Sequence, residues 1–343
     1  MASLCKIEHA IGETRAAIIH KKQTIEYHVR RWSEKNKPHA GDVFSGRVRA
    51  VDKGLMAAFI DLGSEPAGML RFSMSPNAPH MHEGQMIRVK VLRDGEPGKG
   101  PLLGFVELSD VSEPCKEIAQ SLEDEILARY PKIVFEQGDV NGISWACEEE
   151  VALKTGGYIY IEPTRAATMI DVDTAGGQKS KVSIAAAREI AHQVRLRGIG
   201  GLVLIDFPNF RKKKDKADVW QTLKDCFEGD PNTVKIAPFS RFDTVELTRS
   251  RSGPTIAQIL HGPTGQGQSR ELSAETLALQ GLRRLVKEAR IDGGAKLVLE
   301  LPVTAYEWLN AEHIDWKTSL GDKIGQRFTL KSGAKIDVYK DAP

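Results

Sequence analysis

The amino-acid sequence predicts a multidomain protein that mixes α-helices with β-strands, an α/β multidomain (α+β) fold class. At 343 residues, the chain has room for two or three domains. Residues 41–110 carry short strand patterns broken by glycines, which predict a small all-β barrel. Residues 157–206 carry apolar strands on either side of an amphipathic helix, a pattern that can place parallel strands side by side.

The other elements are justified in chain order. Two strand-like runs around a polar turn at residues 20–23 predict an N-terminal β-hairpin. An apolar stripe at helical spacing predicts a helix over residues 113–130, and a second helix is expected over residues 183–197 with Ser183 as its N-cap. A stretch rich in Gly, Pro, Ser and Gln predicts a linker at residues 256–270, before a small α/β unit.

The predicted barrel presents an aromatic side chain and two cations on its outer surface. In the strand at residues 56–62 alternate residues form the apolar face, so Phe59 points outward. Arg88 and Lys90 point outward from a later strand for the same reason. Outward aromatics among cations are how open-faced barrels stack nucleobases and follow phosphates. The alternative is that Phe59 belongs to a second packed face.

Three aspartates follow or interrupt two apolar strands. Asp171 and Asp173 are two residues apart, so they project from the same face of one strand while their neighbours face the core. Asp206 ends the apolar run at residues 202–205. If the two strands are neighbours, Asp171 and Asp206 converge, and paired carboxylates are typical ligands of a hard cation such as Mg²⁺. The alternative for Asp171 and for Asp206 is a carboxylate that caps a nearby helix.

Positive charge is concentrated around Asp206. Residues 179–216 contain ten Lys or Arg and three acids, a net charge of +7, so the rest of the chain carries −5 against a total of +2. A basic field around an acidic metal pocket suits a polyanionic substrate. The candidates for substrate contact, with a solvated helix surface as the alternative, are Arg188, Arg195, Lys212 and Lys213.

Several functional classes are disfavoured. No apolar run approaches the roughly 18 to 20 residues that span a bilayer, and the N-terminus lacks a signal-peptide pattern. The four cysteines form no CxxC pair, which argues against a zinc site and a disulfide framework and fits the cytoplasm. The nine histidines show no metal-ligand spacing, and no P-loop, dinucleotide fingerprint or Ser-His-Asp set is present.

The chain resembles the ribonuclease E/G family of bacterial endoribonucleases at a series of motifs in the family's order. The motifs are Leu153–Tyr158, Ile161–Thr164, Ile170–Thr174, Ala186–Ala191, Gln193–Arg197, Gly200–Phe207, Ser240–Phe242 and Glu246–Arg249. The resemblance implies five parts: a ribonuclease H-like subdomain (1–40 and 111–146), an OB-fold RNA-binding barrel that splits it (41–110), a deoxyribonuclease I-like catalytic subdomain (147–255), the linker (256–270) and a small C-terminal domain (271–343).

The resemblance also implies roles for individual residues. Asp171 and Asp206 match the positions of the family's magnesium ligands, with Mn²⁺ as a possible substitute. Asp173 falls where the family often has an asparagine that supports the site, so it is either a ligand or a supporting residue. Phe59 and Lys99 fall where the family places RNA-contacting residues of the barrel.

This chain departs from the family pattern at three places, the first of which is Met69, where the family has a second base-stacking aromatic of the barrel. Longer members insert a domain that recognises a 5′-monophosphate after the barrel, but here only residues 111–150 lie between the barrel and the first catalytic motif. The family's Cys-Pro-x-Cys zinc clasp reads Gly262-Pro263-Thr264-Gly265 here. We therefore expect no zinc and no zinc-linked dimer, and the oligomeric state is left open.

These observations predict a cytoplasmic, Mg²⁺-dependent endoribonuclease whose partner is single-stranded RNA and not a membrane. It would hydrolyse RNA to 5′-phosphate and 3′-hydroxyl ends in RNA processing or decay, without reading the 5′ end. Two alternatives stay open. One is a non-catalytic RNA-binding factor in ribosome assembly or RNA regulation, and the other is a metal-dependent DNA nuclease.

Overall fold

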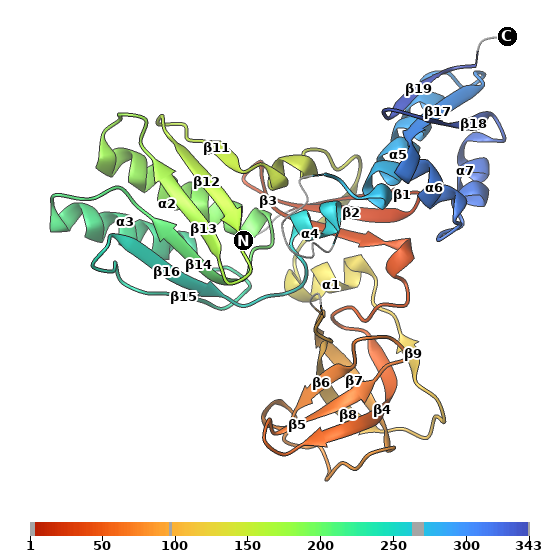
Figure 1. The fold of residues 1–343 in the computed structure, drawn as a ribbon, viewed down its shortest axis with the longest axis horizontal. Coiled ribbons are helices and arrows are strands. Elements are labelled where there is room, and N and C mark those ends of the chain that lie inside the picture. The colour runs from red at the N-terminus through yellow and green to blue at the C-terminus, as the bar shows by residue number, and fades with distance from the viewer. Residues whose placement is uncertain (1–3, 96–97, 263–270, 342–343) are drawn as a thin grey trace.

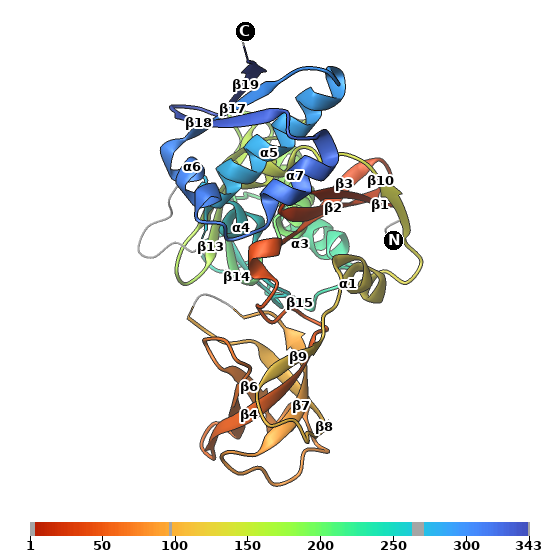
Figure 2. The same ribbon diagram turned by 90° about the vertical axis from the view of Figure 1, so that its right-hand side faces the viewer.

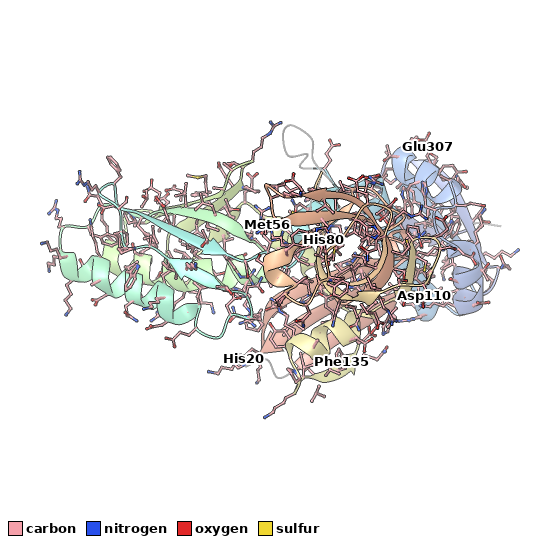
Figure 3. The ribbon with its side chains drawn as sticks, turned by 90° about the horizontal axis from the view of Figure 1, so that it is seen from below. His20, Met56, His80, Asp110, Phe135 and Glu307 are labelled. Carbon is pink, nitrogen blue, oxygen red and sulfur yellow. The ribbon has the colours of Figure 1, made fainter. Side chains whose placement is uncertain are left out.

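The computed structural model describes residues 4–95, 98–262 and 271–341, which form four β-sheets and the helices packed on them. A barrel projects below the remaining units in two perpendicular views (Figures 1 and 2). Seen from below, the barrel with Met56 and His80 lies in front of the junction, and Glu307 marks the C-terminal unit on one side (Figure 3). The predicted mixed α+β fold with a barrel is therefore confirmed.

The first sheet combines the N-terminal strands with one strand from beyond the barrel. β1 (Leu4–Ala10), β2 (Glu13–His20) and β3 (Gln23–Arg31) form an antiparallel meander, and β10 (Val134–Gln137) pairs with β1 in parallel. Helix α1 (Leu122–Arg129) buries its apolar residues against this sheet. The barrel is thus inserted into the chain between two parts of one sheet.

Five strands close the barrel in the order β5-β6-β8-β7-β4, and its interior is a continuous apolar core. The strands are β4 (Val43–Asp52), β5 (Ala57–Asp61), β6 (Gly68–Arg71), β7 (Met86–Arg93) and β8 (Leu102–Leu108).

The predicted helix over residues 113–130 is wrong in its first half. Residues Cys115–Ile118 form strand β9, which pairs with the part of β4 that β5 does not reach. By pairing with β4, the backbone N–H and C=O groups of β9 gain hydrogen-bond partners at an open strand edge. This gain outweighs the helical spacing of the apolar residues. The helix is limited to α1, which begins at a capping box made by Ser121 and Asp124.

The third sheet has the order β11-β12-β13-β14-β16-β15, and only β13 and β14 run parallel. Two helices lie side by side on one face of it (Figure 1), and they bury the largest apolar cluster of the molecule. The elements are β11 (Glu150–Ala152), β12 (Tyr158–Pro163), β13 (Thr168–Asp173), α2 (Lys179–Leu196), β14 (Gly201–Asp206), α3 (Lys213–Cys226), β15 (Val234–Ile236) and β16 (Thr244–Arg249).

Two boundaries differ from the sequence prediction. Helix α2 begins at Lys179, and Ser183, the expected N-cap, is buried inside the helix. The expected linker at residues 256–270 begins with helix α4 (Ile256–His261), which starts at a capping box formed by Thr255 and Gln258. The apolar residues of α4 pack against the end of α2, so this segment is helical despite the Gly and Pro content that predicted a linker. Residues 263–270 of that segment lie outside the described residues.

The C-terminal unit is a three-stranded sheet covered by helices. Strand β17 lies between β18, which is parallel to it, and β19, which is antiparallel. The elements are α5 (Ala274–Ile291), β17 (Leu297–Pro302), α6 (Val303–Asn310), α7 (Trp316–Ile324), β18 (Phe328–Gly333) and β19 (Asp337–Lys340). None of the helices in the described part of the chain is long and apolar enough to cross a membrane.

A buried carboxylate joins the first sheet to the third. Glu26 of β3 accepts hydrogen bonds from Arg195 Nε of α2 at 2.7 Å and from the Tyr130 hydroxyl at 2.5 Å. Burial alone would raise the pKa of Glu26, but its hydrogen bond with His28 and the charges of His28, Arg129 and Arg195 hold that pKa well below its ordinary value. Glu26 is therefore an ionised group at the centre of this interface.

We predict that Glu26→Gln lowers the free energy of unfolding by about 3–5 kcal/mol, because it leaves buried arginine charge without its carboxylate. Denaturant unfolding followed by circular dichroism measures the change. The matched control is Glu136→Gln, an exposed glutamate in β10 of the same sheet, which should change stability by less than about 0.5 kcal/mol. Equal stability of Glu26→Gln and the native protein would contradict this role.

Candidate active site

Two adjacent parallel strands bring Asp171 and Asp206 side by side. In the register of β13 with β14, these aspartates are direct Cα partners at the carboxyl ends of the strands. Helix α2 makes the crossover between the strands, which is the usual way of linking parallel neighbours. Neighbouring strands are about 4.8 Å apart, so the two carboxylates occupy one small region.

The aspartates lie on the face of the sheet that the helices leave open. Ile170, Val172 and Ile205 are buried toward α2 and α3, whereas Asp171 and Asp206 are exposed on the other face. Asp173 shares this open face because it is two residues along β13. The structure therefore places all three acids that the sequence singled out on one open face, with Asp171 and Asp206 adjacent to each other.

The carboxylate of Asp206 is electrostatically strained. Burial raises its pKa above the ordinary value, and the nearby charges of Asp171 and Asp243 raise it further. Asp243 was not identified from the sequence as a residue of this site. It is buried just before β16, forms an ion pair with Lys216 of α3, and has a positive φ of 63°. Aspartate tolerates this left-handed conformation better than most residues, which is the one signal the sequence offers.

Asp173 is held in a fixed position by the turn that follows β13. Its Oδ1 accepts a hydrogen bond from the backbone N–H of Ala175 at 2.8 Å, which leaves Oδ2 of this exposed side chain available. An oxygen in this position can orient a water molecule or accept a proton from it.

The donor set of this site fits a hard cation. Mg²⁺ takes oxygen ligands, retains several waters and needs only one or two protein carboxylates, which Asp171 and Asp206 supply. Within residues 4–95, 98–262 and 271–341, no three His, Cys, Asp or Glu side chains are grouped so as to hold a metal. A cation held here would therefore depend on water or substrate oxygens for its remaining ligands.

The basic residues that were predicted to contact the substrate do not all lie on the same side of the sheet as the acids. Lys212 and Lys213 are exposed at the start of α3, on the segment that follows Asp206. Arg188 is exposed on α2, which covers the opposite face of the sheet from the acids. The expectation that Arg195 lies on an exposed helix face is wrong, because β3 packs on that face and Glu26 pairs with the guanidinium.

In the barrel, Phe59 is half-buried but lies outside the apolar interior, as its outward position predicts. Lys90 and Lys99 are exposed. Arg88 is committed to ion pairs with Glu107 and Glu117, at 2.8 and 2.7 Å, which reduces its availability for RNA.

The barrel meets the end of the third sheet that is remote from the acids. Asp94 of the barrel approaches Gly253, which follows β16, and β16 reaches this end at Arg249, the Cα partner of Gly201. From Gly201 to Asp206, β14 spans about 17 Å at the usual rise of a strand. A cavity of about 630 Å³ occupies the junction and is lined by Lys99 and by residues 252–254. The structure therefore does not bring the barrel residues and the acids together.

Comparisons with known proteins agree on one family. Residues 106–252 match the Ribonuclease E/G family. The chain is 28% identical to Ribonuclease G of Haemophilus influenzae over 236 residues, which cover 65% of this chain and 48% of that protein. It is 30% identical to Ribonuclease E of the same organism over 258 residues (69% and 27%), and 31% identical to Ribonuclease G of Escherichia coli over 191 residues (52% and 38%). The match spans about half or less of each relative.

The raised pKa of Asp206 predicts a stability effect with a definite sign. A carboxyl whose folded pKa lies above its ordinary value of 3.8 favours the folded state at low pH, and this contribution is lost as the pH rises through the folded pKa. Without divalent cations, Asp206→Asn should therefore raise the melting temperature at pH 7 and should have no such effect below pH 3.8.

Thermal unfolding in EDTA and in Mg²⁺ measures both parts of this prediction. Mg²⁺ should stabilise the native protein by mass action and stabilise Asp206→Asn much less. Asp218→Asn, a change at an exposed aspartate of α3, is the control and should respond to Mg²⁺ like the native protein. A lower melting temperature for Asp206→Asn at pH 7 in EDTA would contradict the strain at this site.

Proposed function

Because the chain is a member of the ribonuclease E/G family, we propose that it is a Mg²⁺-dependent endoribonuclease that cleaves single-stranded RNA in RNA processing or decay. The observation that carries the proposal is the in-register pairing of Asp171 with Asp206 at the carboxyl ends of two parallel strands. Two like charges held side by side weaken the fold unless something offsets them. A divalent cation would offset them, and its remaining ligand positions would be open to the phosphate of a substrate.

The residues of the site divide the work of phosphodiester hydrolysis. Asp171 and Asp206 would hold the cation, with Mn²⁺ able to replace Mg²⁺. When bound, such a cation neutralises charge that develops on the phosphate and makes water a better nucleophile. Asp173 Oδ2 would orient the attacking water and take its proton, because Oδ1 is fixed by Ala175. Attack by water yields 5′-phosphate and 3′-hydroxyl ends and does not use the ribose 2′-hydroxyl as the nucleophile.

Lysines near the acids and in the barrel would bind the RNA backbone. Lys212 and Lys213 are exposed beside the acidic end of the sheet, where they would attract phosphates. Phe59, Lys90 and Lys99 of the barrel would bind RNA further from the site, and Arg88 would join them only by leaving its ion pairs. Arg188 and Arg195 are poor candidates, because one lies behind the sheet and the other is paired with Glu26.

The short segment between the barrel and the third sheet supports cleavage that is independent of the RNA 5′ end. Residues 111–150 are occupied by β9, α1, β10 and a 3₁₀ helix that pack on the barrel and the first sheet. They leave little chain for a separate 5′-binding unit. The glycines that replace the zinc-clasp cysteines argue against a zinc-linked dimer. Of that motif Gly262 is described, and residues 263–265 lie outside the described residues.

We predict that Asp206→Asn lowers the rate of RNA cleavage by at least about 100-fold, because it removes a ligand and its charge from the transition state. Single-turnover cleavage of a labelled A/U-rich single-stranded RNA in Mg²⁺ measures the rate, and binding of the same RNA should change little. Asp218→Asn is the matched control. Tight RNA binding with no cleavage by the native protein would instead favour a non-catalytic RNA-binding factor.

Cleavage should proceed at the same rate, within about twofold, whether the RNA begins with a 5′-triphosphate, a 5′-monophosphate or a hydroxyl. The physical reason is that a protein without a 5′-binding unit makes no contact with the 5′-phosphate. A charge-assisted contact with that phosphate would change the rate by far more than twofold, which corresponds to only about 0.4 kcal/mol. Paired cleavage assays on three RNAs that differ only at the 5′ end measure this. A rise of tenfold or more for the monophosphate would reveal a 5′-binding pocket.

A further inference from the structure

Among the described residues, Phe242 is a highly exposed aromatic side chain beside the acids that belongs to no apolar cluster. Resting on the proposed endoribonuclease function, we propose that Phe242 stacks on a nucleobase of the single-stranded RNA, at a nucleotide beside the scissile phosphate. Phe242 would then be a substrate-contacting residue of the active site. Its contact would fix where the RNA crosses the acids, without selecting one base strongly, because every base has a π-face.

The exposure of Phe242 is the first observation. Its side chain is 85% exposed, the highest value among the exposed large apolar side chains of the described residues. Exposed apolar residues are common, but exposure of a whole phenyl ring to water next to acidic side chains contributes nothing to the stability of the fold. It packs into none of the apolar clusters that the described residues form.

The backbone that carries Phe242 is well fixed. Ser240 Oγ accepts hydrogen bonds from the backbone N–H of Phe242 at 3.2 Å and of Thr244 at 3.3 Å, and it lies 2.6 Å from Thr244 Oγ1. The backbone N–H of Ser240 also donates to the Thr244 carbonyl at 2.8 Å. The ion pair of Asp243 with Lys216 ties the same turn to α3. The ring is therefore presented by a rigid turn, which lowers the entropy lost when a base binds.

The position of the turn identifies the occupant. Thr244 is the direct Cα partner of Asp206, and the carbonyl of Asp243 accepts a hydrogen bond from the backbone N–H of Phe207 at 3.4 Å. Phe242 lies two residues before Thr244, a span of at most about 7 Å. A base on this ring would thus belong to the nucleotide beside the scissile phosphate or to the next one. The exposed Arg241 is available for a phosphate of the same strand.

Other aromatic residues near the acids are already accounted for. Tyr160 is the Cα partner of Asp171 on the other side of the site, and its ring centroid lies 6.3 Å from that of Tyr158. Both tyrosines are half-buried, and Tyr160 is also the Cα partner of Glu150 in the neighbouring strand. Their packing explains them without a ligand, whereas nothing within the described chain explains Phe242.

The test compares Phe242→Ala, Phe242→Leu and Phe242→Trp with the native protein. The control is Trp145→Ala, a change at another exposed aromatic side chain (69%). Trp145 lies in the 3₁₀ helix at Ile143–Cys147, which packs with α4 at the C-terminal end of α2, away from the acids. Cleavage is measured on an A/U-rich RNA and on copies with one abasic nucleotide near the cleavage site. Binding is followed by 2-aminopurine fluorescence in the same RNA, in Ca²⁺ and with Asp206→Asn as background.

We expect Phe242→Ala and Phe242→Leu to lower kcat/KM by about 5- to 150-fold, the range of one base–aromatic stack, and Phe242→Trp to retain activity. Trp145→Ala should be unaffected. At one position, an abasic nucleotide should slow cleavage by the native protein as much as Phe242→Ala slows cleavage of the intact RNA. The same abasic RNA should not slow Phe242→Ala any further. Quenching of 2-aminopurine should disappear with Phe242→Ala.

Native-like cleavage and quenching by Phe242→Ala would overturn the proposal. So would a loss of self-association on Phe242→Ala with RNA binding unchanged, since the ring would then contact a second copy of the chain. If the native protein cleaves no RNA, the proposed function fails. The fluorescence arm still decides whether the ring stacks on a base, because it needs no cleavage.

Discussion

The forced proximity of Asp171 and Asp206 is the constraint on which the site depends. Their strands are parallel, adjacent and in register, so the two Cα atoms cannot move apart without breaking backbone pairing. The cost is visible in the raised pKa of Asp206. A protein without use for a cation at this point would be more stable with neutral side chains here. The strain therefore supports a binding role for the pair.

The rest of the third sheet holds this pair in place. Apolar residues on the covered face of β13 and β14 pack on α2 and α3, so the strands cannot slip by one residue without burying the acids. Helix α2 is in turn fixed to the first sheet by the contact of Arg195 with Glu26. On the other side of the site, Lys216 holds the turn that contains Asp243. The acids thus sit on rigid elements, as precise chemistry requires.

The sequence predicted which face of the sheet carries the acids, but it did not predict what surrounds them, for physical reasons. The alternation of side chains along a strand fixes which residues share a face, so Asp171 and Asp173 could be assigned together. The partner of a helix face is a tertiary fact, so Arg195 was expected on the surface although β3 covers it. Asp243 comes near Asp206 only through pairing of β14 with β16, which no local pattern encodes. Three of the barrel strands, β4, β5 and β7, follow from local patterns, but β6, β8 and the distance between the barrel and the acids do not.

The most direct test of a cation held by Asp171 and Asp206 on the scissile phosphate is a metal-rescue measurement. A single phosphorothioate replaces the non-bridging oxygens in turn at one cleavage site of a single-stranded RNA. Sulfur binds Mg²⁺ poorly and softer cations better. One of the two phosphorothioates should be cleaved much more slowly than the phosphate in Mg²⁺, and Mn²⁺ should restore its cleavage to 5′-phosphate and 3′-hydroxyl ends. Equal rates for all three RNAs in Mg²⁺, or products ending in a 2′,3′-cyclic phosphate, would contradict the account.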